Sequence, residues 1–97
     1  MARSISYDTE VGSGVTAQSL PGFGSGAGQI NTIQAFILIT DTTITLNWNG
    51  ANTSMVVAPG DRKAIFMAYG VTTTTVPTIT NAGSTTAIIN VLAGGAA

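Results

Sequence analysis

The residue pattern from Ile30 onward is the feature that most constrains the fold, because it follows the two-residue period of β-strands. Residues 43–49 alternate strictly between apolar and polar side chains, as in a strand with one buried and one exposed face. Apart from Gln34 and Asn90, residues 32–40 and 85–92 are apolar or β-branched at successive positions, which is typical of buried strands. Apolar residues at helical spacing are nowhere sustained, so the sequence predicts an all-β chain.

Turn signals separate these segments. Asn49 and Gly50 form a favoured hairpin signal, which predicts that the chain returns as a strand over residues 54–58. Pro59 and Gly60 predict a type II turn, because Pro presets φ and Gly accepts a positive φ. With a further turn at 81–84, the sequence predicts a single antiparallel β-sandwich or jelly-roll-like domain of six or seven short strands.

Two of the expected strands have special features. Residues 64–69 predict a strand that ends at Gly70. Residues 71–80 carry six threonines and Pro77, which cannot donate a hydrogen bond to a neighbouring strand. This segment is therefore expected at the edge of a sheet or to bend at the proline.

The first 29 residues differ in composition from the rest. They hold only five of the 27 large apolar residues that follow Met1, and six of the 12 glycines lie between Gly12 and Gly28. We divide the chain into a Gly-rich N-terminal arm or outer strands over 1–29 and a β-sandwich domain over 30–97. A flexible arm and ordinary outer strands with a long loop both stay open. The arm interpretation predicts that a chain without residues 1–28 still folds.

The scarcity of charge excludes several classes of function. Only three basic and four acidic residues occur in 97, or 7% against the usual 25% or so, and the net charge is −1. The basic residues form no stripe, so we expect no nucleic-acid partner. The chain contains no His and no Cys, which removes the usual general base, the usual metal ligands and a thiol nucleophile. We expect no enzyme, no cofactor and no metal site.

Hydropathy and the N-terminal residues bear on location. Uninterrupted apolar runs such as residues 35–39 are far shorter than the roughly 20 residues that span a bilayer. No membrane partner is expected. The first eight residues lack the apolar core of a secretory signal, which indicates synthesis in the cytoplasm.

Two weak motifs could carry chemistry. Asp8 and Glu10 would share one face of a strand, and a carboxylate-based glycosidase would have to use them; solvated surface charge is the simpler interpretation. Gly22, Gly24 and Ala27 match the letters of a dinucleotide-binding fingerprint. The strand before it and the helix after it that this fingerprint requires are missing, so we set it aside.

Aromatic and threonine residues suggest two further alternatives. Trp48, Tyr7, Tyr69 and Phe23 could form a stacking platform for sugars, although the phase of Trp48 within its strand favours core packing. The threonines of residues 72–80 could form an ice-binding ladder.

Three residue runs carry a resemblance to a known group of proteins. These are Phe36–Asp41, Met55–Asp61 and Ile79–Ser84, the last leading into a terminal strand of small residues. Together they resemble small accessory virion proteins of tailed bacteriophages, over about two-thirds of the chain. The resemblance implies a small Cys-free subunit made without a signal peptide and used as capsid cement or decoration.

These observations lead to a functional hypothesis. We expect a structural virion protein that binds the major capsid protein and copies of itself and stabilises the particle, located in the virion after synthesis in the host cytoplasm. The alternative is a carbohydrate- or receptor-binding β-sandwich module. Asp61, Arg62 and Lys63 are expected at an exposed loop tip, where an intersubunit ion pair is one use for them. The candidate intersubunit contacts are Arg3, Tyr7, Phe23, Asp61, Arg62 and Lys63.

Overall fold

The computed structural model describes residues 2–97, and its regular secondary structure consists almost entirely of strands. The elements are β1 (Ala2–Val11), β2 (Gln18–Ser19), β3 (Thr32–Thr40), β4 (Ile44–Trp48), the 3-10 turn η1 (Asn49–Ala51), β5 (Thr53–Val57), β6 (Lys63–Ile65), β7 (Tyr69–Gly70), β8 (Thr78–Thr80) and β9 (Ala87–Ala96). In this part of the chain, no helix is long and apolar enough to cross a membrane.

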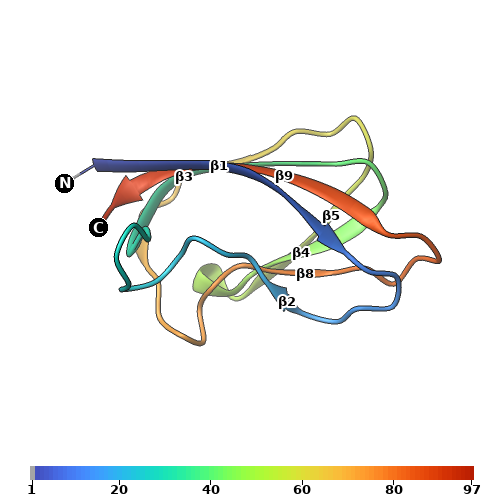
Figure 1. The fold of residues 1–97 in the computed structure, drawn as a ribbon, viewed down its shortest axis with the longest axis horizontal. Helices are drawn as coiled ribbons and strands as arrows, with labels where there is room; N and C mark the ends of the chain where they lie inside the picture. The colour runs from blue at the N-terminus through green and yellow to red at the C-terminus, as the bar shows by residue number, and fades with distance from the viewer. Residues whose placement is uncertain (1) are drawn as a thin grey trace.

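The strands form two antiparallel sheets that pack face to face (Figure 1). Sheet I has the order β1-β9-β3-β6, with β7 also paired to β3, and sheet II has the order β2-β8-β4-β5. The first and last strands are neighbours over their full length, from Ala2 opposite Ala96 to Val11 opposite Ala87. The predicted all-β sandwich is confirmed.

The core lies between the sheets and contains a cluster of three aromatic side chains. Phe36 of β3 and Trp48 of β4 have ring centroids 4.9 Å apart, and Tyr69 meets Trp48 edge to face at the same distance. Trp48 is 1% exposed, so its predicted core position is confirmed. Offset and edge-to-face contacts of this kind contribute roughly 0.5–1.5 kcal/mol beyond simple burial.

Residues 2–31 are built into the sandwich. Residues 2–11, for which an arm and an outer strand were both open, form the edge strand β1. The following loop runs back along the sandwich, held by bonds such as Leu20 N–H to the Pro77 carbonyl at 3.0 Å and Ile30 N–H to the Gly22 carbonyl at 2.9 Å. Leu20 and Phe23, at 2% and 5% exposure, belong to the core.

The local turn chemistry is partly as expected. Gly60 has a φ of 90° and Asp61 N–H bonds the Ala58 carbonyl at 3.1 Å, which confirms the type II turn. The predicted hairpin between β4 and β5 also forms. Its left-handed residue is Asn52, with a φ of 52°, rather than Gly50. Gly50 is required for another reason, because a Cβ there would overlap the Tyr69 ring.

Two strand predictions need correction. The strand expected over 64–69 is split into β6 and β7, and β3 has a register irregularity at the matching position between Ile33 and Ala35. The segment 71–80 bends as expected, but its only strand, β8, begins just after Pro77 and lies between β2 and β4, inside the sheet. Pro77 is tolerated because it precedes the ladder.

Candidate interaction surface

The outer face of sheet I has an apolar centre. The outward side chains come from alternate residues of β1, β9 and β3. Their register aligns them in rows, two of which read Ser6, Leu92, Ile37, Ala64 and Asp8, Asn90, Ile39. Leu92 is 50% exposed, Ile88 44% and Ile39 37%. Contiguous apolar surface of this kind commonly marks an interaction site.

A shallow groove of about 360 Å³ crosses this face. Its floor includes Ile37, Ile39 and Leu92, and Asp8 and Arg62 stand at its two flanks. Asn90 Nδ2 donates a hydrogen bond to Asp8 Oδ1 at 2.7 Å, which orients the carboxylate at the groove edge. The groove therefore has an apolar centre with one negative and one positive flank.

The expectation that β3 and β9 are covered on both faces is wrong for this chain. Only their inner faces are buried, as the alternation of buried and exposed residues along β9 shows. The sequence carries a signal for this surface. A two-sheet sandwich buries only the two inner faces of its sheets, so a strand that is apolar on both sides leaves its outer side for another molecule.

A second surface lies at the two edges of sheet I. Asp41, which follows β3, hydrogen-bonds both the backbone N–H and the backbone carbonyl of Ile88. These two groups of Ile88 therefore point toward β3. Glu10 lies opposite Ile88 on β1, so its own backbone N–H and carbonyl point away from β9. By alternation, Ser4, Ser6 and Asp8 do the same, which makes β1 an edge available for strand pairing.

At the opposite edge, the segment between β6 and β7 exposes large apolar side chains. Phe66 is 74% exposed and Met67 42%. They lie where the edge strand is interrupted, beside the apolar face. We call these two residues the edge lip.

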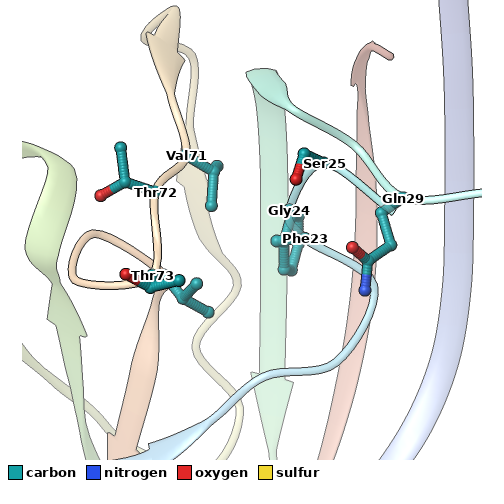
Figure 2. Close-up of a pocket in the computed structure, with 8 residues that line it drawn as sticks. Phe23, Gly24, Ser25, Gln29, Val71, Thr72 and Thr73 are labelled. Atoms are coloured by element: carbon teal, nitrogen blue, oxygen red, sulfur yellow. The ribbon is translucent and has the colours of Figure 1, made fainter. Parts of the chain in front are cut away.

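A separate pocket of about 220 Å³ lies between the Gly-rich loop and the segment after β7 (Figure 2). Phe23, Ser25 and Gln29 line one side, and Val71 and Thr72 the other. Gln29 Oε1 accepts a hydrogen bond from Gly26 N–H at 2.9 Å, so this amide organises the loop itself. Among the described residues, none that lines this pocket has a side chain that titrates near neutral pH.

Three of the four carboxylates support local structure. Besides the bond from Asn90 to Asp8, Asp41 Oδ1 accepts from Ile88 N–H at 2.8 Å and Asp61 Oδ2 from Ala58 N–H at 3.1 Å. Asp8 and Glu10 share the exposed face of β1, as expected. Within residues 2–97, no group of three or more metal-ligating side chains comes together.

Both tyrosines are partly buried at their hydroxyl ends. Tyr7 Oη donates to the Pro21 carbonyl at 2.7 Å, which ties β1 to the following loop. Burial raises the pKa of Tyr7 well above its usual value, and burial raises the pKa of Tyr69 to about 12. Both groups are therefore neutral hydrogen-bond donors at physiological pH.

The six candidate contact residues do not form one cluster. Asp61 and Arg62 are exposed and Lys63 is half-buried at the start of β6. Arg3 and Tyr7 alternate with the exposed residues of β1, so they face the interior side. Phe23 is 5% exposed, packs in the core and lines the pocket beside the Gly-rich loop. An intersubunit role for the six residues stays a prediction, and two of them, Tyr7 and Arg62, line the groove.

Comparison of the chain with protein-family models, with curated proteins and with solved structures finds no match.

Proposed function

We propose that this protein is a structural subunit of a viral particle, a cement or decoration protein that binds the major capsid protein and stabilises the shell. The observation that carries the proposal is the apolar outer face of sheet I, with Ile39, Ile88 and Leu92 each more than one-third exposed. A chain with only seven charged residues has little electrostatic repulsion between copies, and its apolar face is stabilised when a neighbour covers it.

Two kinds of observation support separate parts of this proposal. The apolar face, the open edge of β1 and the edge lip support assembly with other subunits. The resemblance to accessory virion proteins supports the viral setting. The carbohydrate-binding alternative is weakened, because Trp48, its best stacking residue, is 1% exposed and packs against Phe36 and Tyr69.

The proposal is tested by locating the chain in particles. Virions from the source virus are separated on a density gradient, and the chain is quantified by mass spectrometry against the major capsid protein. We expect it to co-sediment with intact particles at a fixed ratio to the capsid subunit. Its absence from intact particles would overturn the proposal.

A rebinding assay identifies the surface that contacts the capsid. Particles made without the chain should bind added wild-type protein saturably. The double variant Phe66→Ser with Met67→Ser should bind at least about tenfold more weakly, because exposed aromatic anchors dominate such contacts. Val56→Ser is the matched control, since Val56 is 67% exposed on sheet II. Equal loss in both variants would contradict a role for the edge lip.

A further inference from the structure

The outer face of sheet I has the apolar centre and the charge arrangement of a self-complementary surface. We infer that it binds a second copy of this chain through a two-fold axis parallel to the strands, with reciprocal ion pairs between Asp8 and Arg62. This inference deepens the proposed function and rests on it for the setting in which copies meet. The partner it names is a second molecule of the same chain.

The register of the strands places the two charges at equal heights on opposite flanks. Asp8 lies opposite Asn90, and Asn90 lies opposite Ile39. On the other side, Leu38 lies opposite Lys63, so antiparallel continuation brings Arg62 beside Ile39, and Arg62 lines the same groove as Asp8. One charge therefore lies on β1 and the other directly before β6, in the same row.

A two-fold axis along the strands, between β9 and β3, has a defined effect on this row. It exchanges the β1 flank with the β6 flank and leaves the height along the strands unchanged. Asp8 of each copy then faces Arg62 of the other, and Leu92 of each copy packs against Ile37 of the other. A closed pair of this kind repeats each contact twice.

The other in-plane axis is disfavoured by charge. An axis across the strands at the height of this row would stack β1 on β1 and β6 on β6, and so bring Asp8 onto its own copy and Arg62 onto its own copy. Like charges brought together at an interface weaken association. Charge complementarity thus selects the axis parallel to the strands.

The dimensions of the face fit this arrangement. Strands β1, β9, β3 and β6 have ten, ten, nine and three residues, and at about 3.3 Å per residue and 4.8 Å per strand they give a face of roughly 500 Å². Two copies would then bury about 1,000 Å² in total, the lower limit for a specific interface. Stacked sheets lie about 10 Å apart and rotate by about 30°. At the outer strands this rotation shifts the charges by about 4 Å, within reach of an arginine side chain.

The test exploits the reciprocity of the ion pairs. Sedimentation equilibrium of the purified wild-type chain should show a monomer–dimer equilibrium. Asp8→Lys and Arg62→Glu should each weaken the dimer about tenfold, since each places two like-charged pairs in the homodimer. An equimolar mixture of the two variants should restore association as a mixed dimer, because both of its cross pairs are then attractive. Native mass spectrometry with one variant isotopically labelled identifies that species.

Apolar variants and a control complete the experiment. Leu92→Ser should weaken the dimer at least tenfold, and Val56→Ser, which removes an exposed apolar side chain from sheet II, should leave it unchanged. Thermal unfolding of each variant checks that the fold is retained. A wild-type chain that is monomeric at millimolar concentration, or a mixture that associates no better than its components, overturns the inference.

The outcome is separable from that of the particle experiment. A chain that dimerises in solution but is absent from virions refutes the proposed function alone. A chain that is found on virions but stays monomeric, with the outer face of sheet I protected on the particle, refutes the self-pairing and assigns the face to the capsid protein.

Discussion

Gly95 shows how close the backbones approach within sheet I. A Cβ at this position would overlap the Thr32 carbonyl oxygen and lie 2.9 Å from Ile30 Cγ2. The carbonyl belongs to the backbone and cannot rotate away, unlike the end of a flexible side chain. A Cβ at the next position, Gly94, would meet its nearest atom, the Arg3 carbonyl oxygen, at an ordinary 3.7 Å.

This difference predicts opposite results for two neighbouring alanine variants. Gly95→Ala should lower the free energy of unfolding by about 1–3 kcal/mol, because an overpacked site forces the strands to shift. Gly94→Ala should leave it unchanged or raise it slightly, because alanine reduces the freedom of the unfolded chain. Urea unfolding followed by Trp48 fluorescence measures both, and equal effects of the two substitutions would contradict the packing described at Gly95.

The tyrosines predict how stability depends on alkaline pH. The pKa of each is raised in the folded state by burial, to about 12 for Tyr69 and further for Tyr7. Their contribution is therefore complete below the unfolded pKa of about 10 and is lost as pH rises from there through the folded pKa. We expect the free energy of unfolding to fall above pH 10.

A phenylalanine variant isolates the part due to Tyr7. Tyr7→Phe loses the bond to the Pro21 carbonyl, so it should be less stable at neutral pH by about 1 kcal/mol. Its stability should also fall less steeply between pH 10 and 12 than that of the wild type. Unfolding curves at several pH values test this, and identical slopes would show that Tyr7 titrates alike in both states.

At the scale of elements, the N-terminal segment can be tested by truncation. Without residues 1–28 the chain lacks Val11, Leu20 and Phe23, all buried, and β9 loses one of its two partner strands. Each core side chain contributes about 2–5 kcal/mol, which together rivals the roughly 5–15 kcal/mol of a whole domain. We therefore expect residues 29–97 alone to be unfolded by circular dichroism, contrary to what a free arm predicts.

Complementation provides the control for this truncation. A synthetic peptide of residues 1–28, added in excess, should restore the β-sheet signal, because it supplies β1 and the missing core side chains. A truncated chain that folds without the peptide would show that β1 is dispensable.

The elements that could be predicted from the sequence are those fixed by neighbouring residues. The β4–β5 hairpin and the turn at Pro59 and Gly60 depend on side chains a few positions apart, so local chemistry indicates them. The split between β6 and β7 depends on the irregularity in β3, and the inner position of β8 on strands 30 or more residues away. Local patterns carry no information on such pairings.

The candidate interaction surface escaped prediction for a related reason. The residues that form it, such as Ile37 and Leu92, were identified as strand residues with both faces covered. Ile37 and Leu92 lie side by side only because β3 pairs with β9, which is distant in the sequence. Of the candidate contact residues, Tyr7 and Arg62 line the groove. Phe23 lies in the core, because a glycine-rich segment can still carry apolar side chains that fill the space between two sheets.

At the scale of the whole molecule, the pairing of β1 with β9 makes the chain close on itself, since Ala2 lies opposite Ala96 (Figure 1). Both β1 and β3 depend on the last strand, so sheet I is completed only by contacts between distant residues. Loop closure of this length makes folding slow, in the millisecond-to-second range common for sandwiches.

A circular permutant tests this consequence. Joining Ala97 to Ala2 with a short Gly-Ser-Gly linker, and opening the chain between Gly83 and Ser84, turns β9 and β1 into a local hairpin. The new ends fall in an exposed turn, so stability should change little. Refolding followed by Trp48 fluorescence in a stopped-flow instrument should be at least severalfold faster, because the longest-range pairing has become local.

A second permutant with the same linker distinguishes two possible causes of faster folding, the local β9–β1 pairing and the choice of the turn that is opened. Opened between Ser13 and Gly14, it also makes β9 and β1 a hairpin, so it should fold faster than the natural order as well. If only one permutant gains speed, the opened turn determines the rate. If neither does, the β1–β9 pairing forms after the rate-limiting step, and the transition state is built instead around the β4–β5 hairpin and its contact with β8.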